Sequence, residues 1–455
     1  MEGIEHTTVR ANGINIHLAE KGQGPIILLL HGFPEFWYSW RHQIHALASL
    51  GYRAVAPDLR GYGDSDAPAD VDSYTYFHLV GDLIGVLDAI GADKVFVVGH
   101  DWGAFIGWNL CLFRPDRVKA LVNLSVSFSP RNAMNKPLQT FRALYGDDYY
   151  ICRFQEPGAI ETEFAEIGID KVLKYFLTSL PAGPLFLPKG KALRDQLGIP
   201  ITLPSWLSEE ELNYYVTKYE NTGFTGGLNY YRNLDLSWEL TAPWTGSQVE
   251  VPAKFIVGDL DLTYNTPGFN ESMTFDELKK HVPLLEEVVV MKGVGHFLQE
   301  EKADEINQHI HAFFQRILLL VLERPECKHR LPPERPDAEN FGEISSLENP
   351  FGYEPGTPIP LPSWLSEEEL NYYVSKFDKT GFLGGLNYYR IFDRSWEFNS
   401  TMVRESDHST QVPLLEEVVV LEGLGHFLQE EKPDEINKQL HDFFQKFWFP
   451  FISFH

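Results

Sequence analysis

One aspartate in the first half of the sequence occupies a position that is typical of a catalytic nucleophile. Asp101 lies in Gly99-His-Asp-Trp-Gly103, after the β-branched run Val95–Val98 and before a stretch with helical character. The two glycines allow a sharp strand–turn–helix connection, whose central side chain projects above the carboxyl end of a sheet. The motif predicts a nucleophile elbow, although an acidic residue that caps a helix would give the same pattern.

The type of side chain at the elbow constrains the substrate. A serine attacks an acyl carbon, whereas a carboxylate that attacks an sp³ carbon leaves an ester whose acyl carbon belongs to the protein. Water can cleave that ester at the carbonyl of Asp101. An aspartate at this position therefore indicates alkyl electrophiles, such as epoxides or alkyl halides, rather than esters or amides.

Hydrolysis of such an ester requires a base and an orienting acid. His296 lies in a Gly-Val-Gly-His loop directly after one predicted strand, and Asp261 follows the preceding strand. Asp259 is nearer to that strand and is the alternative acid. With 16 histidines in the chain, His296 alone would be taken for a surface residue. The order Asp101, Asp261, His296 is nevertheless the nucleophile–acid–base order of α/β hydrolases.

An oxyanion hole is predicted beside the elbow. The His31–Pro34 turn (His-Gly-Phe-Pro) follows another predicted strand, where a backbone N–H group can face the nucleophile. The expected donors are the N–H groups of Phe33 and Trp102. Glu35 and His100 flank them and are candidates for positioning water, with a structural role in the pocket wall as the alternative.

The elements that must hold these residues form an α/β pattern. Short apolar runs that predict buried parallel strands are Ile26–Leu30, Arg53–Ala56, Val95–Val98, Leu121–Leu124, Lys254–Val257 and Glu287–Val290. Helical patterns lie between several of them, and Phe77–Ile90 carries one apolar stripe of 3.6-residue period. This alternation predicts a mostly parallel sheet with helices on both faces.

The strand pattern stops for about 130 residues before it resumes at Lys254. Ser208 followed by Glu211 is a capping box, which indicates that a helix begins there. We expect residues 1–130 and 246–317 to form one core, with residues 131–245 inserted as a helical lid.

The last third of the chain repeats earlier segments. Residues 203–239 and 361–397 are identical at 29 of 37 positions, and residues 282–314 and 412–444 at 25 of 33. The repeat contains no second elbow, no second His-Gly-Phe-Pro turn and no counterpart of Asp261. We therefore expect residues 361–455 to be a non-catalytic partial duplicate, joined by a proline-rich linker (residues 318–360).

Composition limits the binding partners and the cellular compartment that are compatible with this sequence. The net charge of −26 argues against nucleic acid and anionic membranes as partners. Three cysteines, far apart, give neither a disulfide framework nor a metal site, which favours a reducing compartment. The N-terminal residues lack a signal-peptide pattern, and no apolar run is long enough to span a bilayer. We expect a cytoplasmic protein that needs no metal or cofactor.

The motifs together resemble those of the plant-type soluble epoxide hydrolases of the α/β-hydrolase fold, over about residues 1–317. The family's nucleophile, acid and base match Asp101, Asp261 and His296. The resemblance also implies that two lid tyrosines, Tyr150 and Tyr231, hydrogen-bond the epoxide oxygen. Their neighbours Tyr149 and Tyr230 remain alternatives for this role.

The resemblance implies that the protein converts an epoxide and water into a vicinal diol through an alkyl–enzyme ester. Fatty-acid epoxides and styrene-like epoxides are both compatible with the sequence. Haloalkane or haloacid dehalogenases share the elbow aspartate and the tryptophan after it, but they need a halide donor where this chain has Phe33-Pro34-Glu35. A non-catalytic ligand-binding protein of the same fold is the other alternative.

Overall fold

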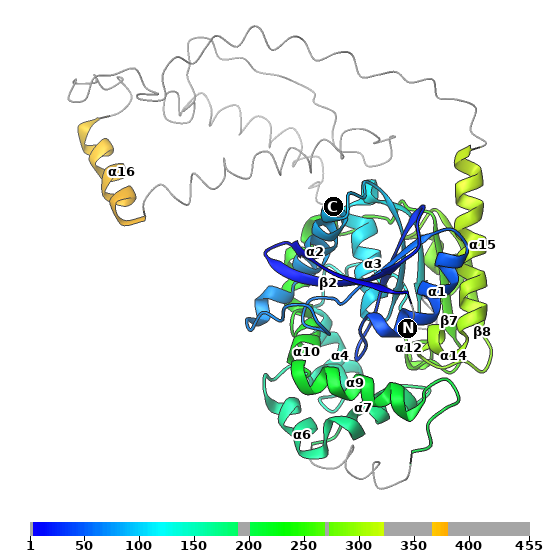
Figure 1. The fold of residues 1–455 in the computed structure, drawn as a ribbon. Coiled ribbons are helices and arrows are strands. Elements are labelled where there is room, and N and C mark those ends of the chain that lie inside the picture. The colour runs from blue at the N-terminus through cyan, green and yellow to red at the C-terminus, as the bar shows by residue number, and fades with distance from the viewer. Residues whose placement is uncertain (1–2, 190–200, 269–272, 323–365, 381–455) are drawn as a thin grey trace, which may run out of the picture. The chain divides into compact units, whose positions relative to one another are not determined.

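The chain divides into two units, Met1–Lys328 and His329–His455, which are considered separately. The residues described by the computed structural model are 3–189, 201–268, 273–322 and 366–380 (Figure 1). In the second unit they form helix α16 (Glu367–Thr380). The remainder of the expected partial duplicate, and the expected linker from residue 323 on, lie outside the described residues.

An eight-stranded sheet forms the centre of the first unit. Its strands are β1 (Glu5–Ala11), β2 (Ile14–Lys21), β3 (Ile26–Leu30), β4 (Arg53–Pro57), β5 (Val95–His100), β6 (Val118–Leu124), β7 (Ala253–Gly258) and β8 (Leu285–Met291). Their order is β1-β2-β4-β3-β5-β6-β7-β8, and β3 to β8 run parallel. Strands β5 and β7 are buried along their whole length, as expected when both faces are covered. The predicted α/β fold with a mostly parallel sheet is confirmed.

The antiparallel hairpin β1–β2 is not among the predicted strands. Strand β1 is polar and largely exposed, so its sequence carries little hydrophobic periodicity. Asn12 and Gly13 connect the two strands with φ of +47° and +86°. An Asn-Gly pair is the residue choice that a tight hairpin turn favours, and it is the signal that could have revealed the hairpin.

Helices that follow the parallel strands cover the sheet. The longer ones are α1 (Arg41–Ser49), α2 (Tyr76–Ala89), α3 (Trp102–Phe113), α13 (Phe275–Lys279) and α15 (Ala303–Leu322), and the short ones are η1 (Trp37–Trp40), η2 (Val71–Tyr74), η3 (Pro115–Arg117), α12 (Leu262–Asn265) and α14 (Leu298–Glu301). Helix α1 packs against α15 and α2 against α3, and Figure 1 shows these pairs on either side of the sheet. Helix α15 continues to Leu322, so residues 318–322 of the expected linker belong to it.

A set of helices lies between β6 and β7 and forms what we call the cap. It comprises α4 (Pro137–Tyr145), α5 (Tyr150–Arg153), α6 (Ala159–Ile167), α7 (Ile169–Thr178), α9 (Glu209–Thr222), α10 (Thr225–Arg232), α11 (Leu234–Leu240) and η4 (Ala242–Trp244). At the start of α9, Ser208 and Glu211 make both hydrogen bonds of the predicted capping box. Among the described residues, no helix is both long enough and apolar enough to cross a membrane.

Candidate active site

The turn between β5 and α3 holds Asp101 in a strained conformation. Asp101 has φ +52° and ψ −118°, which residues with a Cβ rarely adopt and which functional sites tend to retain. A Cβ on Gly99 would overlap with the backbone of Gly103, and one on Gly103 would overlap with the backbone of Leu30. The glycines thus allow the turn, and Asp101 stands at the carboxyl end of β5 and the N-terminus of α3.

Two backbone N–H groups hold the Asp101 carboxylate. The N–H of Phe33 donates to Oδ1 over 2.8 Å, and the N–H of Trp102 also donates to the carboxylate. Burial raises the pKa of Asp101, and the neighbouring His296 and the two N–H groups offset part of this rise. The donors that the sequence predicted for the oxyanion hole therefore meet at the predicted nucleophile.

His296 lies between the two predicted carboxylates. Its Nδ1 is 3.1 Å from Asp261 Oδ1, and its Nε2 is 3.7 Å from Asp101 Oδ2. Burial opposes the ionisation of Asp261, but the charge and hydrogen bond of His296 outweigh it and lower the pKa of this acid. An ionised carboxylate only accepts hydrogen bonds, so Nδ1 carries the hydrogen and Nε2 faces the nucleophile.

The same environment favours the protonated form of His296. Burial disfavours the imidazolium, but the charge and hydrogen bond of Asp261 and the charge of Asp101 prevail and raise the pKa of His296 to about 9. The alternative acid, Asp259, has other partners: its Oδ1 accepts the N–H of Gly293 over 2.7 Å, and its Oδ2 is 3.5 Å from Lys292 Nζ. Asp261 is therefore the acid that contacts His296.

Tyr150 and Tyr231 come from α5 and α10 of the cap and meet near the nucleophile. Their rings pack edge to face with centroids 5.9 Å apart, and the Tyr231 ring is 5.0 Å from that of Trp102. Burial raises the pKa of each phenol well above its usual value, and the charge of Asp101 adds to this rise. Both hydroxyls therefore remain protonated at neutral pH, as hydrogen-bond donors require.

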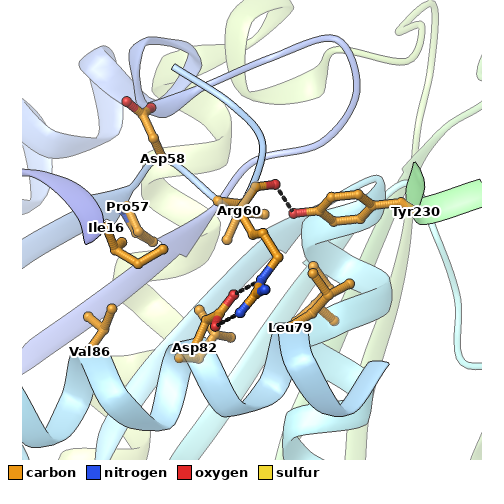
Figure 2. Close-up of a pocket in the computed structure, with 11 residues that line it drawn as sticks. Ile16, Pro57, Asp58, Arg60, Leu79, Asp82, Val86 and Tyr230 are labelled. Atoms are coloured by element: carbon orange, nitrogen blue, oxygen red, sulfur yellow. Dashed lines mark hydrogen bonds and ion pairs between the residues drawn. The ribbon is translucent and has the colours of Figure 1, made fainter. Parts of the chain in front are cut away.

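The adjacent tyrosines have further partners, although Tyr149 also packs on Tyr150, with ring centroids 4.9 Å apart, and hydrogen-bonds to it. The ring of Tyr149 packs on Tyr145 with centroids 4.6 Å apart. The hydroxyl of Tyr230 donates to the Arg60 carbonyl over 2.8 Å, and the Arg60 guanidinium pairs with both oxygens of Asp82 (Figure 2). These groups line a cavity of about 10 Å³, room for a single water molecule. We infer that Tyr230 anchors α10 to the core, which fixes the direction of the next side chain.

Glu35 and His100 form a buried network behind the site. His100 Nδ1 is 2.8 Å from Glu35 Oε2, and its Nε2 donates to the His296 carbonyl over 2.7 Å. Glu35 also accepts the Gly32 N–H over 2.8 Å and the Gln299 amide over 2.6 Å. Burial would raise the pKa of Glu35, but His100 and the Gly32 N–H lower it. Both residues thus connect the oxyanion loop to the backbone of the His296 loop.

Three residues that contact the site were not predicted from the sequence: Ser125, Thr263 and Gln299. Ser125 Oγ is 3.1 Å from His296 Nδ1, and Thr263 Oγ1 is 2.9 Å from Asp261 Oδ1. Ser125 directly follows β6, and the carboxyl ends of parallel strands share one edge of a sheet. That position was a usable signal, whereas nothing local in the sequence distinguishes Gln299.

One group of side chains in the described residues has the composition of a metal site: His17, Asp58 and Asp64. Its atoms already have partners. His17 Nδ1 is 2.8 Å from Asp58 Oδ2, and Asp64 pairs with Lys218 of α9 at 2.5 Å. Asp58 also accepts the backbone N–H of Trp37 over 2.8 Å. We therefore assign this group a structural role in joining β2, the loop after β4 and the cap.

The fold and the elbow define the class of protein. Residues 25–153, which contain the His31–Pro34 turn and Asp101, match the family model described as the α/β hydrolase fold.

Relatives then narrow the class to one family. The chain is 58% identical over 316 residues to epoxide hydrolase 3 of Siraitia grosvenorii, covering 70% of this chain and all of the relative. It is 39% identical over 320 residues to epoxide hydrolase A of Mycobacterium tuberculosis, covering 67% of this chain and 95% of the relative. The crystal structure of an epoxide hydrolase from Vigna radiata matches with a TM-score of 0.68 and 57% identity, over 70% of this chain and 99% of that one. Potato epoxide hydrolase I matches with a TM-score of 0.66 and 57% identity, over 69% of this chain and 99% of that one. The chain belongs to the epoxide hydrolase family of the α/β-hydrolase fold.

Proposed function

We propose that the protein hydrolyses epoxides to vicinal diols through a covalent ester on Asp101. One observation carries this proposal. The Asp101 carboxylate, held by the N–H groups of Phe33 and Trp102, faces His296 Nε2 at 3.7 Å. On the cap side, its charge acts on the phenols of Tyr150 and Tyr231. No step of the proposed mechanism requires a cofactor or a metal.

In the first step, Asp101 attacks a ring carbon of the epoxide and the carbon–oxygen bond opens. Negative charge develops on the ring oxygen, which takes a proton from the pair Tyr150 and Tyr231. Phenols that are protonated at neutral pH supply this proton, and a well-placed acid contributes roughly 10²–10⁴ in rate. The product of this step is a neutral ester on Asp101.

In the second step, His296 Nε2 removes a proton from water, and the resulting hydroxide attacks the ester carbonyl. Formation of the ester removes the negative charge of Asp101, which is one of the groups that raise the pKa of His296. The imidazolium therefore loses its proton more readily once the ester has formed. This proton passes to the phenolate that ring opening left and restores the phenol. Nε2 is then free to act as the base when the ester is hydrolysed.

The tetrahedral intermediate places its oxyanion at the N–H groups of Phe33 and Trp102. Its collapse breaks the bond between the Asp101 carboxyl carbon and the ester oxygen, which takes the proton held by His296 and leaves in the diol. The proton of the regenerated carboxylic acid then passes to His296, so Asp101 and His296 are charged as at the start. We assign Glu35 and His100 the positioning of water and of the His296 loop. The hydrogen bond from His100 to the His296 carbonyl, at 2.7 Å, supports this assignment.

The proposal extends to the organisation and location of the chain. We propose that residues 1–130 and 246–317 form the core and 131–245 the cap, and that 361–455 is a non-catalytic partial duplicate. We also propose a cytoplasmic location. Cys111 and Cys152 are buried free thiols in the structure, which agrees with a reducing compartment.

The decisive experiment traps the ester. The variant His296→Gln, incubated with styrene oxide or a fatty-acid epoxide, should gain the mass of the epoxide on the peptide that contains Asp101. Alkylation does not need the base, whereas hydrolysis does. Asp101→Asn should gain no mass and is the control. Absence of the adduct in His296→Gln would refute the two-step mechanism, and halide release from haloalkanes without diol formation would support a dehalogenase instead.

A further inference from the structure

Three residues other than glycine have positive φ in the described part of the chain: Asn12, Asp101 and Ser125. Asn12 is in the β1–β2 hairpin turn, where such a conformation is common. Asp101 is the proposed nucleophile. Ser125, with φ +72°, is fully buried at the end of β6 and belongs to no hairpin or glycine-rich turn. Strain of this kind persists where the surrounding structure imposes it, often at functional sites.

The Ser125 side chain contacts both members of the acid–base pair. Its Oγ is 3.1 Å from His296 Nδ1, the same distance that separates Nδ1 from Asp261 Oδ1. The Ser125 hydroxyl also lies close enough to the Asp261 carboxylate to contribute, after His296, to the lowered pKa of this acid. Because an ionised carboxylate only accepts hydrogen bonds, the serine O–H is the donor when these two groups interact.

The hydrogen bonds around Asp261 leave a place for this donor. Oδ1 accepts from the N–H of Thr263 at 2.8 Å, from its hydroxyl at 2.9 Å and from His296 Nδ1 at 3.1 Å. Oδ2 is buried and, within the described residues, accepts no hydrogen bond of ordinary geometry. A buried carboxylate oxygen without a donor is costly, and the Ser125 hydroxyl, which interacts with this carboxylate, is a donor that can reduce this cost.

The strained backbone explains how Ser125 reaches this position. Its N–H donates to the Ile256 carbonyl of β7 over 2.9 Å, and its carbonyl shares the single Thr263 hydroxyl hydrogen with Asp261 Oδ1, also over 2.9 Å. Ser125 therefore ties the end of β6 to β7 and to the loop that carries Asp261. The positive φ turns the chain so that the hydroxyl and the carbonyl of one residue both meet that loop.

We propose that Ser125 is a positioning residue, which holds Asp261 and His296 in the orientation and tautomer required for hydrolysis of the ester. The inference rests on the proposed function and deepens it. Ser125 acts through the acid–base pair and does not touch the substrate. Its removal should therefore affect the second chemical step and leave the first nearly unchanged.

The test is Ser125→Ala in the full-length chain, followed by single-turnover kinetics with styrene oxide. Alanine keeps the Cβ, and hence the backbone strain, and removes only the hydroxyl. Ester formation should stay within about threefold of wild type, whereas ester hydrolysis should slow roughly 10-fold, as for loss of a hydrogen bond to a charged group. Without the donor, Asp261 interacts more strongly with the imidazolium, so half-maximal hydrolysis should shift to higher pH.

Ser125→Gly is the companion variant, since glycine adopts positive φ without strain. It should hydrolyse the ester as slowly as Ser125→Ala with a thermal stability at least as high, and it carries the test if the alanine variant does not fold. Wild-type hydrolysis rates, or slower hydrolysis without any shift in the pH profile, would overturn the inference. Failure to detect the ester in His296→Gln would instead reject the proposed function itself.

Discussion

At the residue scale, the ability of each side chain to donate or accept hydrogen bonds determines its proposed role. Asp261 can only accept, so it fixes the hydrogen of His296 on Nδ1 and leaves Nε2 for water. The buried phenols of Tyr150 and Tyr231 retain their hydrogens, so they stabilise the step in which negative charge develops on the substrate oxygen. These limits assign the tyrosines to ring opening and the acid–base pair to ester hydrolysis.

The double variant Tyr150→Phe/Tyr231→Phe should therefore slow ester formation by at least 10²-fold, with a much smaller effect on hydrolysis of an ester already formed. Rapid-quench measurement of the two steps checks this expectation. Tyr175→Phe is the matched control, because it removes a buried phenol of cap helix α7 whose pKa is raised by burial alone and not by Asp101. An unchanged alkylation rate in the double variant would exclude these hydroxyls from the mechanism.

The two aspartates after β7 provide a second matched pair. Asp261→Asn leaves His296 without its charged acceptor and should slow ester hydrolysis roughly 10⁴-fold, as in other triads. Asp259→Asn alters a carboxylate that accepts the Gly293 N–H and should change hydrolysis less than about 10-fold. The same single-turnover assay measures both. Equal losses in the two variants would mean that the acid has been assigned wrongly.

The sequence predicted residues that follow strands but not those that depend on side-chain direction. Asp101, Asp261 and His296 each follow a recognisable strand, so their convergence could be expected from the edge rule for parallel sheets. The choice between Asp261 and Asp259 depended on how a short loop turns, which local pattern does not encode. Gln299 is distant from Glu35 in the chain and meets it through tertiary packing alone.

At the element scale, helix α10 brings Tyr231 to the core through a contact between two glycines. A Cβ on Gly226 would overlap with the backbone of Gly61, so the helix can approach this closely only without a side chain there. The Tyr230 hydroxyl, bonded to the Arg60 carbonyl, holds the same helix one turn further on. The position of α10 therefore depends on backbone contacts with the loop after β4.

Gly226→Ala should displace α10 and slow ester formation about 10²-fold, since a shift near 1 Å in a catalytic group has effects of this size. Gly81→Ala in α2 is the control, because its Cβ would meet the movable side chain of Asn12 at 3.0 Å. That variant should retain the wild-type alkylation rate. Stopped-flow kinetics, with circular dichroism to verify folding, distinguishes the two. Normal alkylation by Gly226→Ala would show that the contact does not fix Tyr231.

Periodicity also explains which elements could be predicted. Strands β3 to β7 are short and largely buried, and β8 is partly buried, with apolar runs that their sequences display. Strand β1 is exposed and polar, so it pairs with β2 through backbone hydrogen bonds and turn geometry, which hydrophobic patterning does not record. The predicted strands were up to three residues shorter than the observed ones at one end, as in β6, which begins at Val118 rather than at Leu121.

At the scale of the whole molecule, stability should depend on the protonation of His296. Its pKa is about 9 in the folded protein and 6.5 when unperturbed, because the carboxylates of Asp261 and Asp101 outweigh the effect of burial. Between these values the folded state binds more protons than the unfolded state, so the free energy of unfolding falls as pH rises. The difference amounts to about 3 kcal/mol.

Urea denaturation at pH 6 and pH 9.5 measures this effect, with His296→Gln as the variant that lacks the titrating group. The free energy of unfolding of the wild type should fall by about 3 kcal/mol more than that of the variant over this pH interval. An equal loss in both proteins would mean that His296 is not held as an imidazolium in the free protein.

The C-terminal copy raises the question of which segment completes the core. Residues 412–444 are identical to residues 282–314 at 25 of 33 positions, so the two segments could compete for the same place in the sheet. The first copy holds β8, the next strand after β7 along the chain, and closing the shorter loop costs less conformational entropy. A core completed by the second copy would also have to leave the Asp261 segment without its following strand.

A chain that ends after Leu322 should therefore keep full epoxide hydrolase activity, with a melting temperature within about 4 °C of the whole protein. The cut follows Leu322 because α15 continues to that residue, and its side chains Ile310, Phe314 and Ile317 are buried in the core. The relatives also match about 70% of this chain over their whole length, so in these proteins the equivalent of this part is the whole protein. Activity assays and differential scanning calorimetry on the two proteins give the comparison. Loss of folding or activity on truncation would show that the C-terminal copy is integral to the core.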